Sequence, residues 1–140
     1  MNKYMLKYGR KLQWKWEVNY SKVNFRVTCM YLKFERINEA LVVHLLGELD
    51  HHSAEEVRVK IDDRIERDNI RKVILNFKGV TFMDSSGIGV VVARYRKVMS
   101  NGGNICVADV NESVNRVFEL SGLFKIIKKF NTVDEAVRCI

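Results

Sequence analysis

The chain has 140 residues, 47% of them hydrophobic, which is enough for one compact domain. No apolar stretch approaches the ~18 residues of a membrane helix, and this excludes stable membrane insertion. Its three cysteines are widely spaced and form no Cys-x-x-Cys pair, a pattern that favours a reducing cytoplasm. The net charge of +7 is concentrated before Met30, where seven basic residues accompany one acidic residue. The remaining 17 basic and 16 acidic residues nearly balance, so the charge of the domain does not indicate a nucleic-acid partner.

Residues 1–29 are predicted to be a basic N-terminal extension, and residues 30–140 the domain. In the extension, hydrophobic and polar residues alternate at strand period from Trp14 to Val18 and from Val23 to Val27, without the long apolar core of a secretory signal. Three interpretations compete: an extra strand or basic patch that touches membrane or nucleic acid, a disordered tail, or translation from upstream of a true start at Met30.

From Met30 the sequence alternates between strand and helix patterns. Leu32 and Phe34 predict an edge strand, and residues 41–49 a longer, more buried one. The string Ser53-Ala54-Glu55-Glu56 predicts a capping box that opens a helix ending at Asp68-Asn69. The helix is expected to bury Ala54, Val57, Ile61 and Ile65 and to turn Glu55, Arg58, Asp62 and Arg67 to solvent.

The next strand, residues 73–77 with an exit through 80–83, leads into Asp84-Ser85-Ser86-Gly87 and a helix expected to start near Ile88. Asp84 or Ser85 is a candidate N-cap, because a short polar side chain accepts hydrogen bonds from the unpaired amides of the first turn. Those amides and the helix dipole also favour an anion, so a phosphoryl group on a serine here would leave the helix intact. This tetrapeptide is therefore the first candidate site.

The remaining elements continue the alternation. The second helix is predicted to end at residues 101–103. Its apolar stripe is predicted to consist of Ile88, Val91, Val92, Tyr95 and Met99. Its outer face is predicted to carry Arg94, Arg96 and Lys97. A strand over 104–110 would bury Cys106 as a small hydrophobe. A helix capped by Asn111 and ended by Gly122, a strand over 126–130 and a helix over 132–139 complete an α/β fold, a mixed central sheet with about four helices packed on it.

Two further sequence features could belong to a binding or catalytic site: the glycines after the serines, and the string Asp50-His51-His52. Gly87 and Gly89 each cost a helix ~1 kcal/mol relative to alanine, so bare backbone there suits the close approach of another protein. Asp50-His51-His52 resembles a metal site or catalytic dyad, but neighbours on an extended segment point to opposite sides, and no Gly-x-Ser-x-Gly or Gly-x-x-x-x-Gly-Lys pattern exists. We therefore predict no catalytic residue, no metal and no cofactor.

Three strings recur in register with one known family: residues 47–55 (GELDHHSAE), 82–89 (FMDSSGIG) and 120–127 (LSGLFKII). Together they resemble the anti-sigma factor antagonists of the sporulation stage II AA type, which consist of a single STAS domain. The resemblance runs from about Tyr31 to the C-terminus. Because it begins one residue after a methionine, it favours translation from upstream of a true start at Met30 over a functional extension.

The resemblance implies a phosphorylation switch in a protein that is not an enzyme. The unphosphorylated protein would bind an anti-sigma factor that is also a serine kinase, and so release the sporulation sigma factor F. That kinase would use ATP to phosphorylate Ser85, the first serine of the motif, and a separate phosphatase would reverse the change. The predicted partner-binding residues are Asp50, His51, His52, Asp84, Ser86, Gly87 and Gly89. The alternatives are a STAS module of another pathway, in the general stress response or a transporter tail, and a small serine hydrolase.

Overall fold

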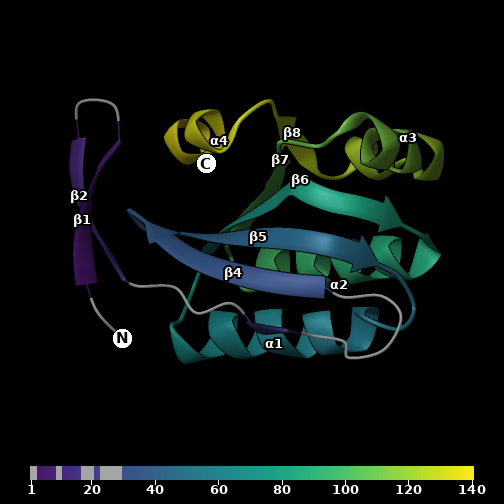
Figure 1. The fold of residues 1–140 in the computed structure, drawn as a ribbon, viewed down its shortest axis with the longest axis horizontal. Helices are drawn as coiled ribbons and strands as arrows, with labels where there is room; N and C mark the ends of the chain where they lie inside the picture. The colour runs from purple at the N-terminus through teal and green to yellow at the C-terminus, as the bar shows by residue number, and fades with distance from the viewer. Residues whose placement is uncertain (1–2, 9–10, 17–20, 23–29) are drawn as a thin grey trace.

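The structure, a computed structural model, describes the backbone of residues 3–8, 11–16 and 21–22 and the whole of residues 30–140. Its centre is a six-stranded mixed sheet (Figure 1). In spatial order the strands are β3 (Ser21–Lys22), β4 (Met30–Ile37), β5 (Ala40–Leu49), β6 (Lys72–Met83), β7 (Asn104–Ala108) and β8 (Lys128–Phe130). The helices are α1 (Ala54–Arg67), α2 (Ser85–Ser100), α3 (Glu112–Ser121) and α4 (Val133–Cys139), and the short 3-10 helix η1 spans Leu123–Lys125. The predicted α/β class, mixed sheet and four helices are confirmed.

Strand pairing sets the directions within this sheet. β4 and β5 form an antiparallel hairpin from Met30↔Gly47 to Ile37↔Ala40, closed by a turn in which Asn38 has a left-handed φ of 56°. β6, β7 and β8 then follow β5 in parallel, so their carboxyl ends lie along one edge. β4 also pairs with β3, so the predicted edge strand has a short outer neighbour.

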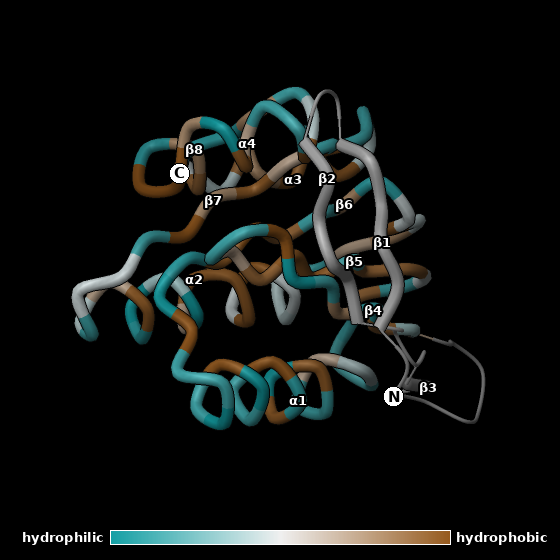
Figure 2. Tube along the Cα trace, turned by 90° about the vertical axis from the view of Figure 1, so that its left-hand side faces the viewer, coloured by the Kyte–Doolittle hydropathy of each residue, from teal (hydrophilic) through white to brown (hydrophobic). Residues whose placement is uncertain are grey.

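The helices bury apolar stripes on both faces of the sheet. α1 and α2 cover one face, and the apolar part of α1 faces the strands in Figure 2. α4 covers the other face through Val133 and Ala136, which pack with Cys106 as predicted for that cysteine. α3 packs beside β6, where the ring of Phe118 meets Phe77 edge-on at 5.2 Å between centroids. Two large apolar clusters therefore hold the sheet between helices.

The predicted N-caps of α2 and α3 are confirmed, and α4 has an N-cap that the sequence analysis did not predict. Asp84, Asn111 and Thr132 each accept a backbone amide of the turn they open, and α3 ends at Gly122 with a left-handed φ of 75°. α1 is the exception, because Ser53 makes no side-chain capping bond and the predicted capping box is wrong. β7 and β8 are shorter than the predicted strands; β7 stops at Ala108, just before Asp109 with a left-handed φ of 52°.

Helix α2 is rotated relative to its predicted stripe. Its buried residues are Gly87, Val90, Val91, Arg94 and Val98. Ile88, Val92 and Tyr95 pack at the margin of the core, whereas Met99 is 42% exposed. The buried face includes Gly87 because a residue without a side chain lets the helix approach Leu49 and Met83 closely, and it includes Arg94 because Asp62 lies opposite it on α1.

The interface between α1 and α2 contains charges that were predicted to face solvent. Arg94 is only 4% exposed, and its Nε lies 2.8 Å from Oδ1 of Asp62, although the two atoms are not aligned as a hydrogen bond. Oδ2 of Asp62 also lies 3.4 Å from Arg58 and 3.7 Å from Lys97. Burial lowers the pKa of the Arg94 guanidinium. Asp62 therefore compensates three cations between two helices.

Within the extension, β1 (Lys3–Tyr8) and β2 (Lys11–Trp16) form a separate antiparallel two-stranded sheet with pairs from Lys3↔Trp16 to Tyr8↔Lys11. Strand backbone at Trp14 and Trp16 agrees with the strand-period alternation. The second alternating run, from Val23 to Val27, lies outside the described residues. The proposals of a disordered tail and of a start at Met30 stay predictions.

Candidate functional site

The candidate site lies where the parallel strands β5 and β6 end side by side. Leu49 and Met83 are register partners at the last position of each strand. One residue further, the backbone amide of Asp84 donates to the carbonyl oxygen of Leu49 over 3.3 Å. This bond brings the turn that follows β5 next to the turn that opens α2, at the edge where open α/β sheets usually present their binding residues.

Asp84 fixes the start of α2. Its carboxylate Oδ1 accepts the backbone amide of Ser86 at 2.8 Å, and its own backbone is extended, as an N-cap requires. Its carbonyl oxygen accepts the amides of Gly87 and Ile88. Asp84 is therefore the cap, and Ser85 is the first residue of the helix.

The two serines differ in exposure. Ser85 is exposed and Ser86 is half-buried. Among the residues that the structure describes, none forms a hydrogen bond with the Ser85 hydroxyl. Because Asp84 already serves the first-turn amide of Ser86, the Ser85 side chain is not needed as a cap. Its hydroxyl can meet an incoming group at a helix N-terminus, where the dipole favours negative charge.

The two glycines have opposite environments. A Cβ on Gly87 would lie 2.7 Å from Cγ of Met83 and 3.0 Å from the carbonyl oxygen of Leu49, and Gly87 is buried. A Cβ on Gly89 would meet no atom within 4 Å, and Gly89 is exposed. The interpretation of both glycines as open backbone is wrong for Gly87, which packs α2 onto the end of β5; only Gly89 lies at the surface.

The turn after β5 is organised by Asp50 and Ser53, both buried. The Asp50 carboxylate accepts the backbone amides of His52 at 2.9 Å and Ser53 at 3.2 Å. The Ser53 hydroxyl accepts the Asp50 amide at 3.1 Å and donates to the Glu48 carbonyl at 2.9 Å. Ser53 thus bonds backward into the turn, which is why it does not cap α1, and Asp50 shapes the turn from inside.

His51 and His52 are exposed on this turn. Their ring centroids are 3.9 Å apart, so the expectation that they point to opposite sides is wrong; a turn, unlike a strand, places neighbouring side chains together. No hydrogen bond joins either imidazole to Ser85 in the described part of the chain. Within residues 30–140, no three His, Cys, Asp or Glu side chains are grouped as metal ligands.

The sequence interpretation missed Phe82. Phe82 is 50% exposed although it lies two residues before the Asp84 cap, and its register partner on β5 is Glu48. The signal was available, since Phe82 precedes the buried Met83 and side chains alternate along a strand. An exposed aromatic ring thus borders the end of the sheet that carries Ser85.

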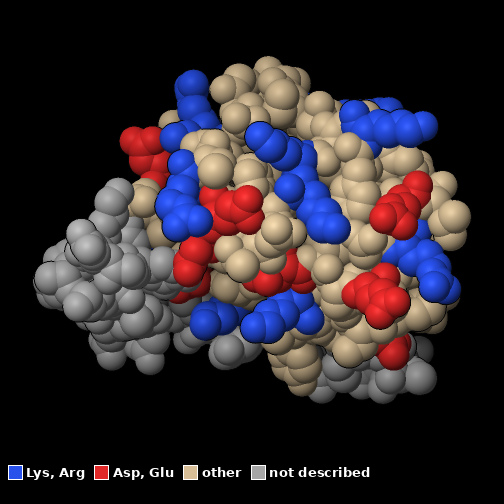
Figure 3. Space-filling view, turned by 90° about the horizontal axis from the view of Figure 1, so that it is seen from above, with Lys and Arg blue, Asp and Glu red and all other residues tan. Residues whose placement is uncertain are grey.

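Charges on the described domain are mixed, as its composition predicts. In the view onto α3 and α4, lysines and arginines alternate with acidic residues and form no continuous basic surface on that face (Figure 3). No helix among the described residues combines the length and apolar character needed to cross a membrane.

Comparisons with known proteins agree with this geometry. The family model for the STAS domain matches residues 31–136. An anti-sigma F factor antagonist from Paenibacillus polymyxa is 42% identical over 98 residues, which are 70% of this chain and 84% of that protein. An anti-sigma-B factor antagonist from Bacillus subtilis (strain 168) is 34% identical over 85 residues, 61% of this chain and 76% of that protein.

Solved structures give the same result. The anti-sigma factor antagonist SpoIIAA in its unphosphorylated form matches 78% of this chain and 97% of its own, with a TM-score of 0.67 and 35% identity. The phosphorylated form of the Bacillus cell fate determinant SpoIIAA matches 76% of this chain and 96% of its own, with a TM-score of 0.61 and 34% identity.

Proposed function

Because this chain belongs to the STAS domain family, and within it to the anti-sigma factor antagonists, we propose that it binds an anti-sigma factor in a manner switched at Ser85. In its unphosphorylated form it captures the anti-sigma factor of the sporulation sigma factor F, which frees that sigma factor for transcription in the cytoplasm. The anti-sigma factor is itself a serine kinase that phosphorylates Ser85, and a separate phosphatase restores the hydroxyl. ATP belongs to the kinase, and this chain contributes no catalytic group.

The observation that carries the proposal is the position of Ser85. It is the first residue of α2 and is exposed, and its hydroxyl bonds to no described residue, while Asp84 caps the helix beside it. A kinase can therefore transfer the γ-phosphoryl group of ATP to the Ser85 oxygen, with loss of the hydroxyl proton, without breaking a capping bond. That one SpoIIAA structure is of a phosphorylated form supports the same chemistry in a relative.

The switch acts at the surface of the domain. A phosphate adds a charge of about −1.5 to −2, and the helix N-terminus tolerates it. The partner, however, would face a dianion next to the Asp84 carboxylate at a surface that fits a neutral hydroxyl. Repulsion and desolvation then cost several kcal/mol of binding free energy. Binding is lost while the fold is kept.

The surface around Ser85 supplies the rest of the contact. Phe82 offers an exposed ring, His51 and His52 offer polar edges, and Gly89 offers open backbone. Asp50, Ser86 and Gly87 act indirectly, because Asp50 and Gly87 are buried and the Ser86 amide is held by Asp84. Phe82 is the residue of this group expected to contribute most, since aromatic anchors dominate interface energies.

The test is labelling with the purified anti-sigma F factor kinase and ATP. The chain should gain one phosphate, Ser85→Ala should gain none, and Ser86→Ala should still be labelled. Undiminished labelling of Ser85→Ala with loss in Ser86→Ala would assign the switch to the second serine. A small serine hydrolase, the rival function, predicts instead that the chain alone turns over an ester and that Ser85→Ala abolishes this turnover.

The second candidate is the same switch in the general stress response, supported by the 34% identity to the anti-sigma-B factor antagonist. The 42% identity to the anti-sigma F factor antagonist favours the sporulation pathway. Offering both anti-sigma factors to the chain at equal concentration separates the two, because the proposal predicts preferential binding to the sigma F type.

A further inference from the structure

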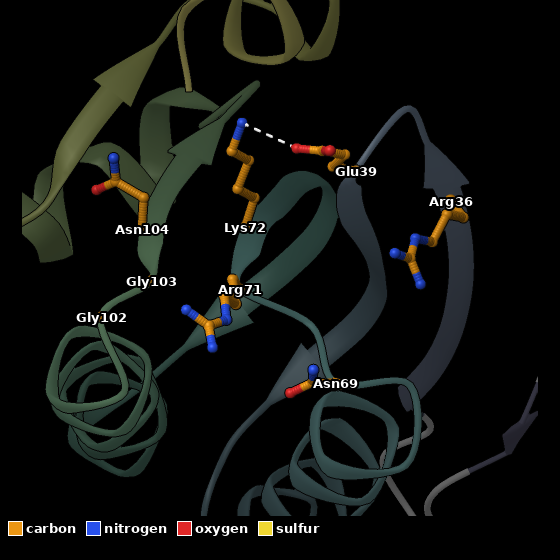
Figure 4. A pocket seen from close by; sticks show the side chains of 8 residues that line it. All are labelled: Arg36, Glu39, Asn69, Arg71, Lys72, Gly102, Gly103 and Asn104. Atoms are coloured by element: carbon orange, nitrogen blue, oxygen red, sulfur yellow. Dashed lines mark ion pairs between the residues drawn. The ribbon is translucent and has the colours of Figure 1, made fainter.

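Strand β6 is held differently at its two ends. From its first residue to Asn76 it pairs with β5 on one side and with β7 on the other. The charged side chains around this start do not converge on one point, because Arg71 is turned away from Arg36 and Lys72 is paired with Glu39 (Figure 4). The polar contacts that bear on the candidate site lie instead at the opposite end of β6.

Beyond Asn76, β6 has an irregular partner on one side and no strand on the other. β7 ends opposite Asn76, so among the described residues no strand pairs on that side with residues 77–83 of β6. On the β5 side, two register shifts place these seven residues beside the five residues 45–49 of β5. β6 therefore bulges twice before Met83 meets Leu49, and the position of the turn that follows depends on these bulges.

The Asn111 side chain takes the place of β7 beside this part of β6. Its Nδ2 donates to the carbonyl oxygen of Val80 at 2.6 Å and to that of Phe77 at 3.4 Å. Carbonyl groups alternate between the two edges of a regular strand, so those of residues three apart point to opposite edges. One amide can reach both carbonyls only because the chain bulges between them. Asn111 therefore binds the bulge itself.

The same side chain caps α3, which fixes its orientation. Its Oδ1 accepts the Val114 amide at 3.1 Å and the Ser113 hydroxyl at 3.0 Å. Because the Val114 amide can only donate and the β6 carbonyls can only accept, one orientation of the Asn111 amide satisfies both. Toward β5, a Cβ on Gly79 would lie 2.8 Å from Cδ2 of Leu46. The bulge is therefore held between α3 and β5.

We propose that Asn111 is a positioning residue for the switch at Ser85. By holding the bulge, it sets the register in which Met83 meets Leu49 and the Asp84 amide reaches the Leu49 carbonyl. Asn111 acts through β6, because its side chain bonds to β6 and α3 and to no residue of the Ser85 turn within the described chain. Its effect on phosphorylation rests on the function proposed above for Ser85.

The register of β6 decides which side chains border Ser85. Phe82 is 50% exposed, whereas Met83 is 5% exposed. If β6 lost one residue of the bulge, every following side chain would move to the other face of the sheet, so that Phe82 would be buried and Met83 exposed. Asp84 would then no longer stand opposite the end of β5. Removing the donor of Asn111 should therefore loosen the turn that presents Ser85.

The test separates the two roles of Asn111. Asn111→Asp keeps an oxygen that caps α3 but replaces the amide donor by a carboxylate oxygen that faces the β6 carbonyls. Asn111→Ser also keeps a cap and adds no charge, so it carries the test if the aspartate variant does not fold. Thr132→Ala is the matched control, because Thr132 caps α4 by accepting the Glu135 amide at 3.1 Å and its side chain bonds to no described residue of β6.

The first measurement is amide hydrogen exchange of the full chain by NMR. Exchange of the Asp84 amide, which donates to Leu49, should be about tenfold faster or more in Asn111→Asp, because the turn opens locally. Thr132→Ala should change this rate less than about twofold, because it weakens the fold elsewhere. The comparison separates a loosened turn from a general loss of stability.

The second measurement is the rate at which the purified anti-sigma F factor kinase labels Ser85 with ATP, at a temperature where all variants are folded. We expect kcat/KM to fall about fivefold or more in Asn111→Asp, because a misplaced acceptor oxygen reacts slowly. It should stay within about twofold of the parent value in Thr132→Ala, since a destabilised but folded chain still presents Ser85 correctly.

The proposal is overturned if the Asp84 amide exchanges at the parent rate in both Asn111 variants, or if these variants are labelled as fast as Thr132→Ala. Hydrogen exchange needs no kinase. A parent chain that the kinase does not label would therefore refute the proposed function, while the exchange rate of the Asp84 amide would still decide whether Asn111 positions the turn.

Discussion

The carbonyl oxygen of Leu49 lies 3.0 Å from where a Cβ on Gly87 would stand, so the end of β5 and the first turn of α2 are packed backbone to backbone. The same carbonyl accepts the amide of Asp84. One strand end thus fixes both the cap of α2 and the depth of its first turn. Ser85, between these two contacts, is held at the surface.

Gly87→Ala and Gly89→Ala should have opposite effects on stability. Alanine at Gly89 has open space and should raise the free energy of unfolding by about 0.5–1 kcal/mol through helix propensity. Alanine at Gly87 would collide with Met83 and the Leu49 carbonyl and should lower it by about 1–3 kcal/mol. Urea unfolding of the two variants measures this; stabilisation by both would contradict the close packing.

Asp84→Ala should destabilise the domain, and Ser85→Ala should not. Loss of the Asp84 cap costs about 0.5–2 kcal/mol, whereas the Ser85 hydroxyl bonds to no described residue and its removal should change stability by less than about 0.5 kcal/mol. The structure thereby decides between Asp84 and Ser85, which were both candidate N-caps from the sequence. Equal losses in thermal unfolding would show that Ser85 shares the capping role.

Asp62→Ala should be far more damaging than Arg94→Met. Removing Asp62 leaves Arg94 buried without a counter-charge and should cost about 3–5 kcal/mol, whereas Asp62 retains Arg58 and Lys97 when Arg94 becomes methionine. We expect Arg94→Met to stay within about 1 kcal/mol of the parent or to exceed it. Chemical denaturation distinguishes the two; similar losses would mean that Arg94 contributes more than it costs.

Cys106 should be protected from alkylation in the folded protein, unlike the exposed Cys139. Burial raises the pKa of the Cys106 thiol from 9.0 to about 12. The unfolded chain therefore loses this proton first, so the contribution to stability is complete below pH 9.0 and decreases as the pH rises toward 12. Peptide mapping after iodoacetamide treatment at pH 8, with and without urea, measures the protection; rapid modification of Cys106 without urea would contradict it.

The sequence predicted element order better than it predicted which face of an element is buried. Strand and helix periodicity, Asn111 and Gly122 placed α3 correctly, because both ends carry local capping signals. The stripe of α2 was misassigned because close packing at Gly87 depends on Leu49, 38 positions earlier in the chain, and Arg94 is buried because Asp62 lies opposite it on α1. Such long-range contacts leave no periodic signal.

At the candidate site, too, local signals were predicted correctly and long-range contacts were not. Asp84 and Ser85 were recognised because N-cap chemistry is local. Two features depend on how the chain turns after β5, which residue types alone do not specify. The Ser53 hydroxyl donates to the Glu48 carbonyl, and the rings of His51 and His52 contact each other. Phe82 was missed because residues 80–83 were treated as one strand exit, without assigning their side chains to the two faces of the sheet.

The central claim, that one phosphate on Ser85 turns binding off locally, is tested most directly by calorimetric titration of the anti-sigma F factor kinase with the phosphorylated and unphosphorylated chain. We expect phosphorylation to weaken binding at least a hundredfold, corresponding to a loss of about 3 kcal/mol. Ser85→Asp should weaken it partially, with amide shifts confined to residues 82–92. Equal affinity of the two forms, or shifts throughout the sheet and distant helices, would contradict the account.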